Sequence, residues 1–117
     1  MRVDKLTSKF QMALAEAQSL AVGRDHQFIE PAHLMLALLD QEGSSMHHLL
    51  AGAGVNVPLL RTKLDEILDH MALVEGAAGE VHISRELEKL LNLTDKYAQV
   101  RKDQFIASEL FALAALE

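Results

Sequence analysis

Apolar side chains recur every three or four positions near the start of the chain, and polar residues fill the positions between them. A helical period of 3.6 residues places such a stripe on one face of a helix. The pattern predicts an amphipathic helix from about Lys5 to Val22, ended by Gly23 in a left-handed conformation. The stripe consists of Leu6, Phe10, Ala13, Leu14, Ala17, Leu20 and Ala21.

The same period predicts five more helices along the chain. Pro31 favours a first helical turn, and Asn56 and Ser84 are residue types that cap helix starts. No apolar–polar alternation typical of a strand competes with these patterns, so the sequence predicts an all-α fold. The expected helices cover about residues 31–40, 45–53, 57–70, 84–101 and 108–117.

Part of the sequence occurs twice. Leu14–Leu39 and Leu91–Leu116 match at nine positions when they are offset by 77 residues, and both contain Gln-Phe-Ile between two helices. Self-similarity of this kind indicates one supersecondary unit used twice. It predicts a pseudo-twofold duplicated helical repeat, with a groove at the seam. The matching pairs are Leu14/Leu91, Ala21/Ala98, Arg24/Arg101, Gln27/Gln104, Phe28/Phe105, Ile29/Ile106, Leu36/Leu113, Ala37/Ala114 and Leu39/Leu116.

The repeat also sets the expected domain organisation. We expect residues 1–117 to form a single domain, with repeat one over about 1–70, a linker over about 71–83 and repeat two over about 84–117. The third and fourth helices of repeat one have no counterpart before Glu117. The second repeat is therefore expected to be truncated at its C-terminal side, and the last helix to keep apolar surface that the missing helices would cover.

Composition and charge exclude several classes of function. The formal net charge is −6 and the chain has no cysteine, which argues against a nucleic-acid surface and against thiolate metal sites. Apolar runs such as Leu34–Leu39 are too short to span a membrane, and no signal peptide is visible. The six histidines lack the spacing of helical metal ligands. The glycine-rich segment Glu75–Glu80 lacks the Lys-Ser/Thr of a phosphate-binding loop. We expect a cytoplasmic location and no bound metal.

Two apolar strips on the fifth expected helix suggest an interaction surface. The strip containing Leu87 and Leu91 should face the core, and a second strip contains Leu93, Tyr97 and Val100. A second strip either binds a partner or is covered by helices absent from this chain. Both explanations stay open. No nucleophile motif is present, and the only enzymatic alternative that remains is His33 acting with a carboxylate such as that of Glu30.

Several segments together resemble the Clp amino-terminal domain family, which is found in AAA+ disaggregases and unfoldases. The resemblance covers the whole chain and includes the duplication. It implies a mobile, non-catalytic module joined to two ATPase rings of a homo-hexamer, which extracts polypeptides from aggregates under stress together with the DnaK chaperone system. ATP and Mg²⁺ would bind in those absent modules, and no cofactor in this chain. The segments are Met1–Gln11, Ala17–Ala21, Gln27–Pro31, Ala37–Leu39, Gln41–Gly43, Ser108–Phe111 and Leu113–Leu116.

The resemblance also implies a peptide-binding groove with an apolar floor and a polar rim. Without it, Thr7 reads as a first-turn residue, Asp103 as a turn residue, and Glu109 as a carboxylate favoured by a helix dipole. Unfolded or aggregated polypeptide is the expected ligand, and docking of a folded adaptor, as in the ClpA and ClpC branches, is the alternative. The residues that match the family's groove are Thr7, Asp103 and Glu109 on the rim and Leu93, Tyr97 and Leu110 on the floor.

Overall fold

A computed structural model describes residues 2–41, 45–74 and 81–115 and confirms the all-α fold. Six α-helices follow a short 3-10 turn, and two strands of two residues each lie between them. The predicted linker segment Glu75–Glu80 lies outside the described residues. The elements are η1 (Val3–Lys5), α1 (Ser8–Gly23), β1 (Phe28–Ile29), α2 (Pro31–Asp40), α3 (Met46–Gly52), α4 (Val57–Asp69), β2 (His82–Ile83), α5 (Arg85–Val100) and α6 (Ser108–Ala115).

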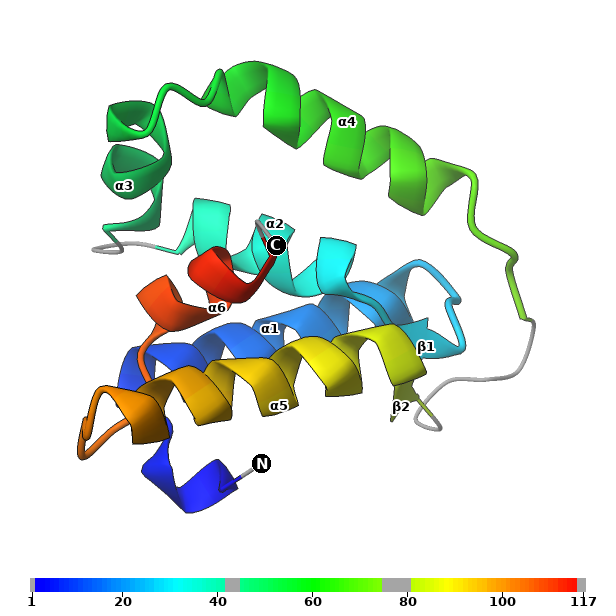
Figure 1. The fold of residues 1–117 in the computed structure, drawn as a ribbon. Coiled ribbons are helices and arrows are strands. Elements are labelled where there is room, and N and C mark those ends of the chain that lie inside the picture. The colour runs from blue at the N-terminus through cyan, green and yellow to red at the C-terminus, as the bar shows by residue number, and fades with distance from the viewer. Residues whose placement is uncertain (1, 42–44, 75–80, 116–117) are drawn as a thin grey trace.

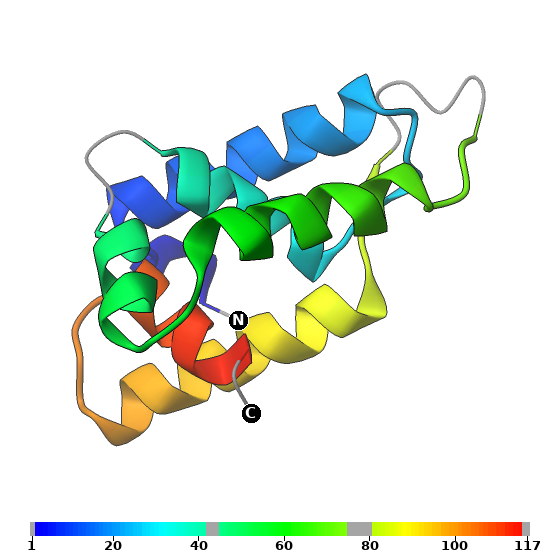
Figure 2. The ribbon, with the colours of Figure 1, turned by 90° about the horizontal axis from the view of Figure 1, so that it is seen from above.

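The helices form three levels, which Figure 1 shows from the side. The long helices α1 and α5 form the lowest level, and α2 packs on α1 as α6 packs on α5. Helix α4 lies over α2 on the side away from α1, and α3 lies at the end of the molecule against α6. Seen from above in Figure 2, α1 and α5 lie on opposite sides of α4.

Two short extended pairings connect the two repeats. Ile29 pairs with Ile83 in the parallel β1–β2 sheet, and Leu6 forms a parallel bridge with Ile106. A shift of 77 residues converts one pair into the other, because Leu6 corresponds to Ile83 and Ile29 to Ile106. Each repeat therefore contributes to both connections, as a pseudo-twofold axis requires. Sequence periodicity missed these strands, since two residues are too few to show an alternation.

The start and end of α1 differ from the prediction. The helix begins at Ser8 rather than near Lys5, because Thr7 is its N-cap and accepts a hydrogen bond from the Phe10 amide at 3.2 Å. Gly23 is still helical, and the left-handed residue after it is Asp25, with φ of 59°. An aspartate tolerates this conformation better than most side chains do.

The core lies where the two repeats meet. Phe10 of α1 and Phe111 of α6 are fully buried, and their rings meet edge to face with centroids 6.1 Å apart. Edge-to-face contacts of this kind add to the stabilisation that burial of apolar area provides. The predicted inner stripe of α5 is confirmed at Leu87, Leu91 and Ala98, which are buried.

An ion pair between a buried carboxylate and a partly exposed guanidinium, which the sequence did not suggest, anchors the N-terminal segment to α5. Asp95 is 6% exposed, and its carboxylate accepts hydrogen bonds from the Arg2 guanidinium at 2.6 and 2.9 Å and from the Arg2 amide at 3.1 Å. The hydrogen bond from the Arg2 side chain lowers the pKa of Asp95 to about 2.

Candidate binding site between α3 and α6

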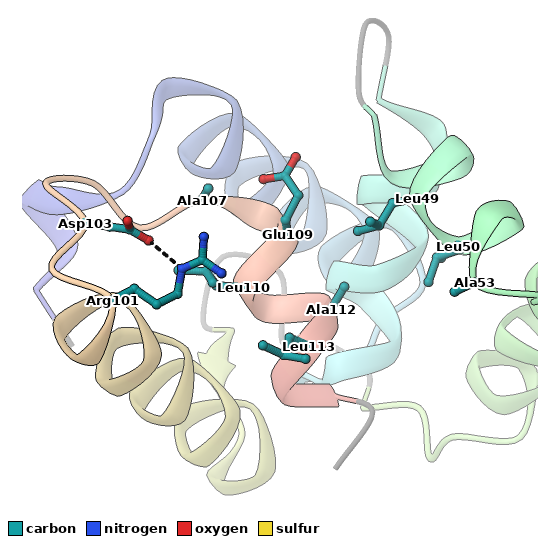
Figure 3. A pocket seen from close by; sticks show the side chains of 10 residues that line it. All are labelled: Leu49, Leu50, Ala53, Arg101, Asp103, Ala107, Glu109, Leu110, Ala112 and Leu113. Carbon is teal, nitrogen blue, oxygen red and sulfur yellow. Dashed lines mark hydrogen bonds and ion pairs between the residues drawn. The ribbon is translucent and has the colours of Figure 1, made fainter.

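A pocket of about 440 Å³ lies between α3 and α6 and opens to solvent (Figure 3). Its wall is mostly apolar. Leu49 of α3 and Leu113 of α6 are 43% and 45% exposed, which is high for leucine. The pocket therefore offers apolar surface that water covers in the isolated domain. Its lining consists of Leu49, Leu50, Ala53, Arg101, Asp103, Ala107, Glu109, Leu110, Ala112 and Leu113.

Charged groups stand at the edge of this pocket. Arg101 pairs with Asp103 across 3.2 Å between Nε and Oδ2, as the dashed line in Figure 3 shows. The other carboxylate, Glu109, accepts a hydrogen bond from the Ser45 hydroxyl at 2.7 Å. A hydroxyl does not neutralise a carboxylate, so Glu109 keeps its negative charge beside the apolar wall.

A smaller polar pocket of about 210 Å³ adjoins the first one. The two pockets share Ala107 and Glu109. Thr7 lines the polar pocket and so lies near Glu109, although its hydroxyl is also the N-cap of α1. The lining of the polar pocket is Thr7, Lys9, Gln41, Ser45, Ala107, Ser108 and Glu109.

The structure brings together only some of the six residues that the family resemblance indicated. Asp103, Glu109 and Leu110 line the apolar pocket, and Thr7 lines its polar neighbour. Leu110 is only 5% exposed, so it offers a guest little surface of its own. Its side chain belongs to the hydrophobic core between the two repeats. The same side chain forms the floor of the pocket.

The residues of the second apolar strip of α5 differ in exposure. Leu93 and Tyr97 are half-buried, and Tyr97 packs against the core, whereas Val100 is 72% exposed. Neither Leu93 nor Tyr97 is among the residues that line the pocket between α3 and α6. Their assignment to a peptide-binding groove stays a prediction that this pocket does not support.

The α3 side of the pocket was not predicted from the sequence. Leu49, Leu50 and Ala53 supply this wall, and Ser45 fixes Glu109 from the same side. The available signal was the pair Leu49-Leu50 on a short helix, because adjacent side chains point about 100° apart and a helix at the surface often buries only one of them. Leu50 is buried, and Leu49 is left at the surface.

A second apolar hollow, of about 350 Å³, lies between α2, α4 and α6. Ile67 of α4 is 53% exposed at its edge, and Ala115 lies on its α6 side. Together with the exposed Leu113, this hollow confirms that the last helix keeps uncovered apolar surface. The hollow is lined by Pro31, Ala32, Met35, Leu50, Val55, Leu60, Leu64, Ile67, Phe111, Ala112 and Ala115.

The enzymatic alternative at His33 does not fit the geometry. His33 is completely buried, its Nδ1 accepts a hydrogen bond from the Glu30 amide, and its Nε2 lies 2.8 Å from His26 Nδ1. With both ring nitrogens engaged inside the protein, the imidazole cannot reach a substrate. Among the described residues, no three or more His, Asp or Glu side chains gather as a metal site would require. None of the described helices is long and apolar enough to span a bilayer.

Comparison with known proteins agrees with this architecture. The chain is 56% identical to chaperone protein ClpB of Vibrio cholerae and 49% identical to ClpB of Pseudomonas putida, in each case over the whole chain. It spans 14% of the length of each of these relatives. The whole of this chain therefore corresponds to a small part of each of these much longer proteins.

Solved structures show the same fold at low sequence identity. The N-terminal domain of Hsp104 from Candida albicans matches with a TM-score of 0.86 and 19% identity, over 97% of this chain and 74% of that chain. The N-domain of ClpV from Vibrio cholerae matches with a TM-score of 0.83 and 24% identity, over 97% of this chain and 67% of that chain. The family described as the Clp repeat (R) N-terminal domain matches residues 5–117. The duplicated helical chain belongs to this Clp N-terminal domain family.

Proposed function

We propose that the domain recognises unfolded or aggregated polypeptides and that the pocket between α3 and α6 is the binding site. The observation that carries this proposal is an open pocket of about 440 Å³ with two exposed leucines on facing helices, Leu49 and Leu113. Exposed apolar surface of this kind on a folded domain marks an interaction site. A folded guest protein would keep most of its own apolar side chains buried, whereas an unfolded guest exposes apolar side chains that can bind this surface.

The charges at the pocket predict which segments bind best. Glu109 and Asp103 place carboxylates beside the apolar wall, and Arg101 offsets one of them. An apolar side chain that enters the pocket would therefore be favoured when Lys or Arg flanks it, because opposite charges at a rim add selectivity and speed association. Thr7 and Lys9 in the adjoining polar pocket would contact the flanking residues.

In the full-length protein, the domain would hand bound segments to an ATP-driven disaggregase homo-hexamer of the ClpB type, acting with the DnaK system in the cytoplasm. ATP and Mg²⁺ would act in modules outside this chain. Weak binding is sufficient for such a task, because several linked copies raise the effective concentration of sites without any new contact. The domain itself would contribute capture, and no chemical step.

Docking of a folded adaptor is the second candidate. One solved structure, 23% identical with a TM-score of 0.85, is the N-terminal domain of ClpV1 from an E. coli type VI secretion system, and another solved match is described as a peptide from the SciI protein of such a system. Binding of one defined partner segment is therefore compatible with this fold. Competition separates the two candidates: an unfolded chain displaces a labelled unfolded probe from the pocket, and an adaptor-specific site would not bind that probe at all.

The direct test replaces the two exposed leucines of the pocket. Leu49→Ser and Leu113→Ser each remove apolar area that a guest would bury, so we expect each to weaken binding of fluorescein-labelled casein by roughly tenfold in an anisotropy titration. Leu59→Ser is the matched control, because Leu59 on α4 is 49% exposed and lines none of the three pockets described above. Equal affinities for the parent and both pocket variants would remove this pocket from the mechanism.

A further inference from the structure

Two buried imidazoles meet behind the turn that joins α1 to α2. His26 is 1% exposed, His33 is fully buried, and His26 Nδ1 lies 2.8 Å from His33 Nε2. Their rings meet edge to face at a centroid distance of 5.0 Å. The proposed binding function does not use this pair, since neither histidine lines the pocket between α3 and α6.

The backbone fixes which ring nitrogens carry protons. The Glu30 amide donates to His33 Nδ1 at 2.8 Å, so Nδ1 is bare and the proton of a neutral His33 lies on Nε2. That N–H must donate to His26 Nδ1, which leaves the His26 proton on Nε2. His26 Nε2 is buried and has no hydrogen-bond partner among the described residues. The protons are thus ordered along one path from Glu30 through His33 to His26.

A further proton cannot enter this path without breaking it. On His33 it would occupy Nδ1, where the Glu30 N–H already points. On His26 it would occupy Nδ1, where the His33 N–H already points. In both cases two donors face each other across a distance suited to a hydrogen bond, between two rings that are both buried. A buried polar group that loses its partner costs free energy comparable to desolvating that group.

The surrounding charges strengthen the effect. Burial, followed by the neighbouring His26 and the Arg24 guanidinium, lowers the pKa of His33 to about 4. Arg24 is held in place by Asp65 and Asp69 of α4, at 3.1 and 3.0 Å. No carboxylate is hydrogen-bonded to either imidazole in the described structure, so nothing there stabilises a charged ring.

We propose that the His26–His33 pair is an acid-sensitive latch, which holds the turn of residues 24–30 closed while both rings are neutral and opens it when the pair takes up one proton. Opening this turn would also loosen β1, which pairs with β2, and the contact of Arg24 with α4. An unfolded histidine titrates near 6.5, so the open state binds more protons below that pH. The closed turn therefore keeps its full stability above about pH 6.5 and loses it as the pH falls toward about 4.

Amide hydrogen exchange followed by NMR tests this latch on the unmodified 117-residue chain. After correction for intrinsic exchange rates, we expect the opening of residues 24–30 to increase roughly tenfold per pH unit below about 6.5. Residues 101–107 form the equivalent turn of repeat two and lack the histidines, so their exchange should not show this increase. Long-range imidazole spectra should show proton-bearing Nε2 atoms on both His26 and His33 at pH 7.

A variant separates the latch from a general acid effect. His33→Leu installs the residue that repeat two has at the equivalent position, Leu110, and should abolish the pH dependence of the turn between pH 6.5 and 4.5. His70→Asn, at an exposed histidine, should preserve it. Exchange in residues 24–30 of the parent that stays constant between pH 6.5 and 4.5, or imidazole spectra that show either ring protonated while the turn stays closed, would overturn the proposal even if the leucine variant failed to fold.

Discussion

The turn between α1 and α2 and the turn between α5 and α6 have the same backbone conformation. Asp25 in the first and Lys102 in the second have positive φ angles of 59° and 61°. The next residue, His26 or Asp103, donates its amide hydrogen to the carbonyl five residues earlier, at 2.9 Å in both turns. The duplication therefore preserved the path of the chain in detail.

The side chains at equivalent positions of the two turns differ in their surroundings. His26 and His33 meet in the interior of repeat one, whereas their equivalents 77 residues later, Asp103 and Leu110, line an open pocket. Two substitutions on one backbone thus separate a sealed turn from a candidate binding site. A duplicated fold can reserve one copy for stability and leave the other copy for recognition.

The largest expected effect tests whether the pocket floor belongs to the core. Leu110→Gln removes a leucine that is 5% exposed and buries an amide in its place. We expect the free energy of unfolding to fall by about 3 kcal/mol in urea denaturation. Leu113→Gln, on the same helix but 45% exposed, should cost less than about 1 kcal/mol. Equal losses would contradict the division of α6 into a buried floor and an exposed wall.

The next effect concerns the contact between Arg2 and Asp95, which joins the two repeats. Asp95 binds Arg2, whereas its equivalent in repeat one, Gln18, is exposed. Asp95→Asn should lower the free energy of unfolding at pH 7 by about 1 kcal/mol, because a charge-assisted contact is lost whose guanidinium side is partly screened by solvent. Gln18→Ala is the control and should change little.

The pH dependence of this contact follows from the lowered pKa of Asp95, about 2 in the folded state. Its stabilisation is complete above the ordinary pKa of about 3.9 and disappears as the pH falls from there through about 2. The difference between the parent and Asp95→Asn should therefore shrink across this window. A difference that stays constant from pH 7 to pH 2 would show that the ion pair contributes nothing.

Periodicity predicted the helices well because each one buries an apolar face. The inner stripe of α5 and the caps Asn56 and Ser84 were predicted from the sequence alone, and the structure shows both caps accepting an amide hydrogen bond. The duplication predicted the pairing of the repeats. These features depend on residues near one another in the chain, or on a pattern repeated at one offset.

What the sequence could not show depends on contacts between distant residues. The His26–His33 hydrogen bond, the Arg2–Asp95 pair and the α3 wall of the pocket join segments whose meeting no local pattern indicates. The histidines were judged by metal-ligand spacing, which does not detect two rings that bind each other. The resemblance places Leu110 on the floor of a groove but says nothing about how much of its side chain is exposed.

The smallest expected effect concerns the position of the Glu109 carboxylate at the edge of the pocket. Ser45 is the N-cap of α3 but does not cap that helix with its side chain, and its hydroxyl instead donates to Glu109. Because serine is a favoured capping residue, its use on a neighbouring helix indicates that the position of Glu109 matters more here than the cap. The contact is exposed, so its contribution to stability is small.

Ser45→Ala should therefore leave the unfolding midpoint almost unchanged and alter selectivity instead. Once freed, the Glu109 carboxylate no longer points steadily at the pocket edge, and the preference for a labelled Leu-containing peptide flanked by Lys over one flanked by Glu should fall about twofold. Ser45→Thr retains the hydroxyl and should restore the preference. If Ser45→Ala and Glu109→Gln together lower the preference by the product of their separate effects, the two side chains act independently and Ser45 does not position the carboxylate.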